Sequence, residues 1–459
     1  MASLLTIKRR ELAPLVEFVL WDAERRKALG QPSHVMIGDG NHLFVEPRIL
    51  RTEIARSMVG QPERFGRTVV VVENADAKSS EQLQEHYAGL QAGDAAAQLN
   101  ARKMEERVVA AAKTLSPAQV AELADALEWT KLATDGASLV FPDRRTGLNL
   151  EGKSRDEVYA DLLSPTRFQA SHRCKEIVAA EVAAKLSPQE LAALEAKENR
   201  ISTKMFGGVD GLASLPASDA GTADRVARDG KMAEGNATVI LLYGAAHLAK
   251  GKDLDEHLKG THITVEPDEG GALAMRMLYL EQPHLFNDFP QVAWRHFAKD
   301  PDESLMIMDE AILKAWHQRQ HGTVLSDDEA KVRVRATKAA YLGFADPTPD
   351  LARLDLWEIA AGKREGTKEQ QERARLEFGV LRPTDTQPQM TGTEPGFTGE
   401  TMSDYRKRMA VPACYAEARE IVEAIKQSIA PSLRDEDSDV NAPTSPKDPI
   451  GKGERRREI

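Results

Sequence analysis

The sequence predicts an α/β fold in which a central sheet carries helices on both faces. Two apolar runs, residues 35–37 and 239–243, each end in a small-residue turn that carries a histidine. A third run, residues 68–72, is continuous and β-branched, which is typical of a strand buried on both faces. We therefore expect two strand–turn–helix halves in one sheet, with a large helical insertion between them and a helical C-terminal region.

The composition predicts a sizeable core and excludes some classes of partner. The chain has 459 residues, of which 41% are hydrophobic and only 5% aromatic. Its net charge of −11 argues against a general nucleic-acid or anionic-membrane binder, because phosphate groups would be repelled on average. No uncharged apolar run approaches the ~20 residues that a membrane-spanning helix needs. We therefore expect no nucleic-acid partner and no membrane span.

The cysteines predict the cellular compartment. Cys174 and Cys414 belong to no CxxC pair and to no zinc-ribbon spacing. This usage is typical of a reducing compartment and predicts no disulfide framework. The start of the chain has the pattern of an amphipathic helix and not of a signal peptide. A cytoplasmic protein is the default prediction, and export without a hydrophobic signal stays open.

Residues 1–76 form the first half of the predicted core, with an N-terminal helix. After a strand that begins at His34, the Glu46-Pro47 step can start a helix, because proline suits the first helical position. Gly60 can end this helix. The strand over residues 68–72 then ends at Glu73.

Residues 77–235 are predicted to be a mainly helical insertion. Ser116-Pro117 and Ser187-Pro188 have the pattern of two helix starts of one type, with serine as the N-cap. Residues 236–290 form the second half of the core, with a short helix over 253–259 and a strand that ends at Glu266.

The remaining residues are predicted to add helices and an unstructured end. Residues 291–430 read as helical, with tryptophans as core anchors at Trp294, Trp316 and Trp357. Within this region, residues 382–402 are rich in Pro, Thr and Gly and predict a linker or extended loop. Residues 431–459 are charged and nearly devoid of large apolar groups, so we expect a disordered tail.

Polar side chains follow the predicted strands of both halves. Asp39 and His42 follow the first strand, Glu73 ends the second, and His247 follows a third. In open α/β sheets, ligands bind outside the carboxyl ends of the strands. If these three strands are neighbours, the four side chains meet at one edge of the sheet.

Two imidazoles and two carboxylates support two kinds of chemistry. His42, His247, Asp39 and Glu73 match the ligand set of a divalent metal such as Zn, Mn or Co, with open positions for water. Without a metal, a histidine oriented by a carboxylate can take a proton from water and direct it at a carbonyl. A third interpretation treats both histidines as hydrogen-bonded turn residues.

Arginines are the predicted substrate-binding groups. Arg48 and Arg51 lie three residues apart on one helix face and could hold a carboxylate or stabilise an oxyanion. Arg228 precedes the third strand and could enter from the other side. The alternative for the helix arginines is a solvated face. Two further histidines, His317 and His321, are four residues apart without an HExxH motif, which favours a surface face.

The chain resembles the superfamily that joins erythromycin esterases, ChaN-like haem-linked proteins and the TraB/TIKI group. Residues 37–42, Ile-Gly-Asp-Gly-Asn-His, are similar to its Gly-Glu-x-x-His motif, with Asp39 in place of the usual glutamate. Residues 70–73 resemble its strand that ends in glutamate. Residues 228–233 and 242–248, which include Tyr243, resemble the TraB-type Arg-Asn-x-x-Met and Gly-x-x-His-Leu motifs.

The resemblance implies a hydrolase with its site at the strand ends. In that picture His42 and His247 act as bases or metal ligands, and Asp39 and Glu73 orient them. Substrate-binding groups would be Arg48, Arg51, Arg228 and Tyr243. The substrate would be a small molecule or peptide with an ester or amide bond. The alternative is a non-enzymatic protein that holds haem or a metal with the same histidines. In both cases the helical regions could contact protein partners.

Overall fold

The computed structural model describes most of the chain. The described residues are 2–39, 46–73, 77–111, 128–142, 165–206, 222–224, 226, 228, 236–244, 248, 254, 258–266, 269–284, 286, 288–295, 304–345, 348–383 and 402–440. His42 and His247 therefore lie outside the described residues, as do the predicted helix start at Ser116 and most of the predicted helix over 253–259.

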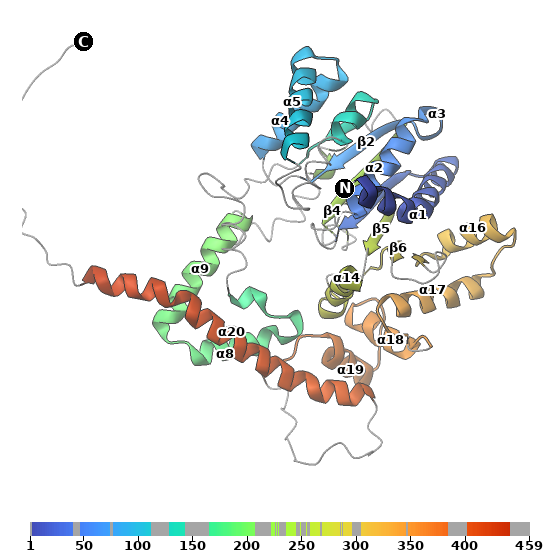
Figure 1. The fold of residues 1–459 in the computed structure, drawn as a ribbon. Helices are drawn as coiled ribbons and strands as arrows, with labels where there is room; N and C mark the ends of the chain where they lie inside the picture. The colour runs from blue at the N-terminus through green and yellow to red at the C-terminus, as the bar shows by residue number, and fades with distance from the viewer. Residues whose placement is uncertain are drawn as a thin grey trace, which may run out of the picture.

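A seven-stranded sheet forms the centre of the molecule, and the predicted α/β fold is confirmed (Figure 1). The strand order is β3-β2-β4-β1-β5-β6-β7, and all neighbours are parallel except β6 and β7. The strands are β1 (His34–Asp39), β2 (Arg67–Val72), β3 (Ser138–Val140), β4 (Ala237–Gly244), β5 (Gly260–Glu266), β6 (Val292–Arg295) and β7 (Leu305–Ile307).

One face of the sheet is covered by helices that come mainly from the N-terminal half of the chain. Alternate side chains of the strands, such as Ile37, Val70 and Ile240, pack there in one apolar cluster. The helices of this layer are α1 (Ala2–Ala28), α2 (Glu46–Val59), α4 (Ala77–Gln91), α5 (Ala95–Ala111), the helix over 128–134 and α16 (Glu310–His321). The short α3 (Pro62–Phe65) leads into β2.

The opposite face is covered by two further groups of segments. Over β2, β4 and β1, the intervening residues of the strands pack against Ala223, Val226 and the leucines 248, 254 and 258. Over β6, Ala293 packs with a helical cluster made of α14 (Glu269–Glu281), α17 (Asp327–Tyr341), α18 (Leu351–Ala360) and α19 (Lys368–Phe378). Burial on both faces explains the continuous apolar strands, because neither face meets water.

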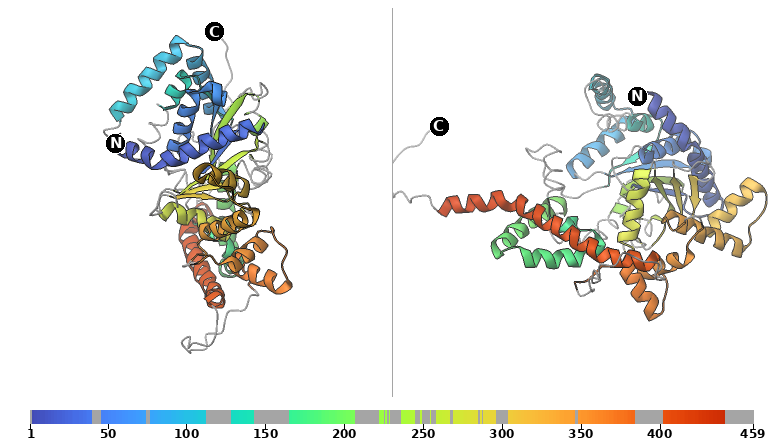
Figure 2. Two further views of the ribbon diagram at one scale, coloured as in Figure 1. Left: turned by 90° about the vertical axis from the view of Figure 1, so that its right-hand side faces the viewer. Right: turned by 60° about the horizontal axis from the view of Figure 1, so that its bottom comes forward.

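A separate helical unit lies beside the α/β core. It consists of η1 (Arg167–Gln169), η2 (His172–Cys174), α8 (Lys175–Lys185), α9 (Pro188–Phe206) and α20 (Met402–Val440). Figure 1 and the right view of Figure 2 show α20 running along α8 and α9, away from the sheet. The predicted helix start at Ser187 is present, since its hydroxyl accepts the Glu190 N–H and Glu190 accepts the Ser187 N–H.

The prediction of no disulfide is wrong. Cys174 of η2 and Cys414 of α20 are bonded, with Cα atoms 5.0 Å apart, inside the apolar core of the helical unit. The two residues are 240 positions apart in sequence, so only the packing of η2 against α20 brings them together.

The structure also differs from the predicted boundaries of the core. The sheet extends beyond residue 290, because Trp294 lies in β6 and is followed by β7. The insertion over 77–235 contributes β3 to the sheet edge. At the C-terminal end, α20 continues to Val440, inside the segment predicted to be disordered. Among the described helices, none has a stretch long and apolar enough to cross a bilayer.

Removing the disulfide should destabilise the helical unit. The Cys174→Ser/Cys414→Ser variant should lose about 2–4 kcal/mol of unfolding free energy, because the cross-link restricts the unfolded chain. Chemical denaturation of the full chain measures this loss. The wild type under reducing conditions should lose the same amount. An unchanged midpoint on reduction would contradict the assignment of the bond.

Acid should weaken the fold through His34. Its Nδ1 accepts the Val239 N–H at 3.3 Å, and burial, with Arg26 nearby, lowers the pKa of His34 to about 4. Between pH 6.5 and 4 the unfolded chain therefore binds a proton that the folded chain does not, so stability falls as pH falls. The expected slope from this residue is about 1.4 kcal/mol per pH unit. Urea denaturation at several pH values should give His34→Gln a shallower slope than the wild type, and equal slopes would refute this origin.

Candidate functional site

The carboxyl ends of β2, β4 and β1 lie side by side, as the site prediction requires. The three strands are consecutive in the sheet and parallel, with Val72 level with Leu242 and Asp39 level with Gly244. The predicted polar residues therefore follow the ends of three consecutive strands, and neighbouring strands are about 4.8 Å apart.

The pair β1 and β4 is a topological switch point. The connection after β1 leads through α2, whose residues pack on the first face of the sheet. The connection after β4 contains Leu248, Leu254 and Leu258, which pack on the opposite face. Where neighbouring strands send their connections to opposite faces, a crevice opens outside their carboxyl ends. His42 and His247 belong to these two connections, three residues beyond Asp39 and Gly244.

Glu73 is held at this edge by the backbone of β4. Its Oε2 accepts the Gly244 N–H at 3.0 Å, and the residue is half-buried. Tyr243 is buried in β4, one residue beyond the last registered pair of β2 and β4, which puts it next to Glu73. Glu73, Tyr243 and the end of β1 therefore lie next to one another at this edge of the sheet. Asp39 is the last residue of β1, and its side chain is outside the described part.

The predicted arginines have different environments. Arg51 is buried in α2, with its guanidinium over the Trp129 ring, 5.5 Å from the ring centroid. Arg48 is half-buried in the same helix, and Arg228 is exposed. Arg51 is therefore not part of a solvated helix face, and its charge is partly stabilised by an aromatic ring.

A second polar cluster lies at the same edge, where β5 and β6 end. Glu266 is the last residue of β5 and is fully buried, and Arg295 ends β6. The two residues are in register, and Arg295 Nε donates to Glu266 Oε2 at 2.8 Å. Burial raises the pKa of the Glu266 carboxyl, and Arg295 opposes this shift. The sequence signal for this site was Glu266 at the end of an apolar strand, but its partner could not be identified without the register.

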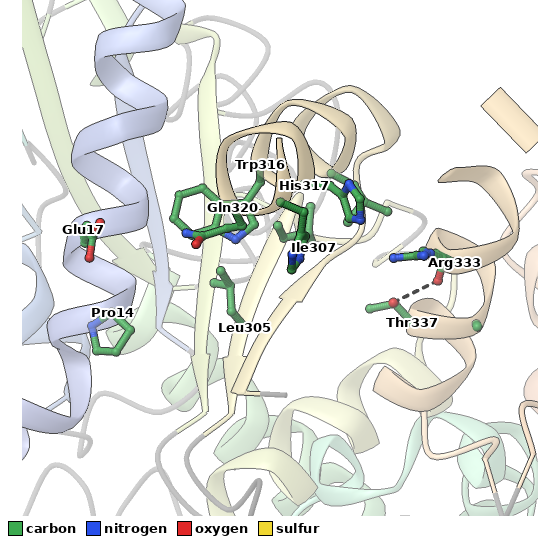
Figure 3. A pocket seen from close by; sticks show the side chains of 12 residues that line it. Pro14, Glu17, Leu305, Ile307, Trp316, His317, Gln320, Arg333 and Thr337 are labelled. Carbon is green, nitrogen blue, oxygen red and sulfur yellow. Dashed lines mark hydrogen bonds between the residues drawn. The ribbon is translucent and has the colours of Figure 1, made fainter. Parts of the chain in front are cut away.

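A cavity of about 640 Å³ lies at the far edge of the sheet. Figure 3 shows its lining from α1, β7, α16 and α17: Pro14 and Glu17 lie on one side, Arg333 and Thr337 on the other, and the residues of β7 and α16 between them. His317 and His321 stand together over this cavity, with ring centroids 4.5 Å apart. β7 is three strands from β1 in the sheet order, so this cavity does not open onto the β1–β4 switch point.

Within the described residues, no group of three or more His, Cys, Asp and Glu side chains is arranged to hold a metal ion. No protein-family model matches the chain, and comparisons with curated proteins and with solved structures find no significant similarity.

Breaking the Glu266–Arg295 pair should be costly. Glu266→Ala leaves the Arg295 charge buried without its carboxylate, so we expect a loss of about 3–5 kcal/mol in unfolding free energy. As a control, Glu372→Ala removes the partner of Arg375 in an exposed pair on α19 and should cost far less. Denaturant titration of both variants measures the difference. Equal, small losses would mean that the buried pair does not stabilise the strand ends.

Proposed function

We propose that this protein is a hydrolase that cleaves an ester or amide bond at the carboxyl ends of β1, β2 and β4. The observation that carries the proposal is the topological switch point between β1 and β4. The two connections that leave there, to opposite faces, are the ones that contain His42 and His247. Glu73, held by the Gly244 N–H, supplies a fixed carboxylate at the same edge.

In the proposed reaction, a histidine acts as general base on a water molecule. His42 takes a proton from the water, and the water oxygen forms a bond to the carbonyl carbon of the substrate. The bond to the leaving oxygen or nitrogen then breaks, and the leaving group receives the proton. Asp39 and Glu73 orient the imidazoles of His42 and His247. Arg51 or Arg228 offsets the charge of the oxyanion, and Tyr243 lines the substrate side.

The same donor set suits a divalent metal. Two imidazoles with two carboxylates are ligands that Zn, Mn and Co accept, and Glu73 already has one oxygen fixed by a backbone donor, as metal-ligating carboxylates commonly do. His42, His247, Asp39 and Glu73 would hold the ion, which would polarise the water or the carbonyl when bound. The proposed substrates are small molecules or peptides. The Cys174–Cys414 bond removes the argument that the cysteines gave for a cytoplasmic location.

Hydrolysis should depend on the edge residues and not on other histidines. His42→Ala and Glu73→Gln should each reduce turnover of ester and peptide substrates at least about 100-fold. The first removes the base that takes the proton from water, and the second removes the carboxylate charge that orients the imidazoles. His321→Ala, at the far edge of the sheet, is the matched control and should retain activity. Circular dichroism verifies folding. Full activity in His42→Ala would contradict the proposal.

Metal content separates the two forms of the mechanism. If the site holds a metal, elemental analysis of the purified wild type should give near-stoichiometric metal that is lost in both His42→Ala and His247→Ala. Metal retained in both variants would contradict a shared site. A Soret band on haem titration that disappears in the same variants, with no turnover in the wild type, would instead support a haem-binding protein.

A further inference from the structure

The polar cluster at the ends of β5 and β6 contains more positive than negative charge. Glu266 and Arg295 form a buried ion pair at 2.8 Å. A second guanidinium, that of Arg276 on α14, lies close enough to interact electrostatically with both Arg295 and Glu266. Two cationic groups therefore share one carboxylate among the described residues of this cluster.

Arg276 has no partner of its own in the part of the chain that the structure describes. Its Nε is buried and makes no hydrogen bond there, and no ion pair joins its guanidinium to a carboxylate. Burial, and next the nearby Arg295, lower the pKa of Arg276. A half-buried arginine beside another arginine is unfavourable unless an anion completes the group.

A glycine leaves room for the guanidinium of Arg276. Gly343, which follows α17 with φ of +75°, lies directly under it. A Cβ at this glycine would come within 2.9 Å of Arg276 Nη1, so a side chain there would displace the guanidinium. The positive φ and the missing side chain both explain glycine at this position.

Several buried polar atoms beside the cluster also lack partners. The Thr264 hydroxyl makes no hydrogen bond within the described residues. Neither the Tyr341 hydroxyl nor the Glu266 Oε1 makes a hydrogen bond of full geometry there, although these two side chains are close enough to interact. Buried polar groups are normally satisfied, so a group of such atoms indicates a polar ligand or ordered water.

We propose that Arg276 of α14 and Arg295 at the end of β6 bind an anionic group of the substrate, a carboxylate or a phosphate. Guanidinium groups suit both, because their donors match the paired oxygens of either group. The assignment of this anion to the substrate rests on the proposed function, whereas anion binding itself does not.

The position of the cluster sets the size of the substrate. β6 is two strands from β1, which separates the anion subsite from the β1–β4 switch point by about 10 Å. Between them, Gly38 of β1 is level with Tyr243 and Thr264, so no side chain of β1 stands between these residues on that face. The substrate is therefore an ester or amide with an acidic group about 10 Å from the bond that is cleaved.

Titration with simple anions tests the subsite without any turnover. Calorimetry on the full chain at constant ionic strength should show saturable binding of inorganic phosphate or of acetate, with sodium chloride as the non-specific control. The anion that binds more tightly identifies the substrate's acidic group as phosphate or carboxylate.

Arginine variants test which group binds. Arg276→Gln should weaken binding of the preferred anion at least tenfold, and Arg276→Lys should weaken it less because the charge remains. Arg375→Gln changes a partly exposed arginine of α19 that is paired with Glu372; this variant is the matched control and should bind as the wild type does. Since Arg276 lacks a partner and faces Arg295, Arg276→Gln should be at least as stable as the wild type. A purely structural arginine would instead destabilise the protein when removed.

Two results would overturn the subsite: no saturable binding of either anion, or equal binding in Arg276→Gln and the wild type. Glu73→Gln separates this failure from that of the proposed function. That variant should lose hydrolysis and keep anion binding. If the wild type binds the anion but hydrolyses nothing, the proposed hydrolase is rejected and the anion subsite stands. If it hydrolyses substrates but binds no anion, the subsite is rejected and the hydrolase stands.

Discussion

The parallel pairing of β1 with β4 on one side and β5 on the other is the constraint on which the rest of the structure depends. Parallel neighbours cannot be joined by a short turn, so each pairing requires a crossover across a face of the sheet. The crossover after β1 uses one face and the crossover after β4 uses the other. This division buries the strands on both sides and opens the edge between β1 and β4, where the proposed site lies.

Two glutamates at this edge have opposite environments. Glu73 is half-buried and accepts the Gly244 N–H at the end of β4, so its carboxylate remains in contact with water. Glu266 is fully buried and paired with Arg295, in a region of low dielectric where charges interact strongly over distance. The first environment suits a carboxylate that orients a reacting group. The second suits a carboxylate that holds the Arg295 guanidinium in a fixed position.

The helical unit is connected to the core by apolar packing and a backbone hydrogen bond at Leu381. Its apolar interior is made by η2, α8, α9 and α20. The Cys174–Cys414 bond links η2 to α20, two segments that are far apart in sequence. Leu381, which follows α19, packs into the same interior, and its N–H donates to the carbonyl of Arg173. The unit is thereby tied to the helices that cover β6.

The sequence predicted those parts of the fold that local pattern determines. β1, β2, β4 and β5 were predicted because β-branched and apolar runs mark strands buried on both faces. β3, β6 and β7 were not, since runs of three or four residues carry little periodicity, and Trp294 was assigned to a helical region for this reason. The disulfide and the Glu266–Arg295 pair depend on tertiary packing and strand register, which a single sequence does not reveal. At the candidate site, the sequence predicted that Asp39 and Glu73 lie at one edge of the sheet, and the structure has β4 between their two strands. The sequence did not identify Arg276 or Tyr341, which belong to the cluster at the ends of β5 and β6.

The most direct test of the central claim is the distance between residues 42 and 247. Spin labels on the His42→Cys/His247→Cys variant report it by pulsed electron resonance in the full chain. Labels on Asp39→Cys/Gly244→Cys supply the reference, because those two residues are level in β1 and β4. If both histidine positions lie at the β1–β4 edge, the two mean distances should agree within about one strand spacing, about 5 Å. A distance several strand spacings longer than the reference would contradict a common site.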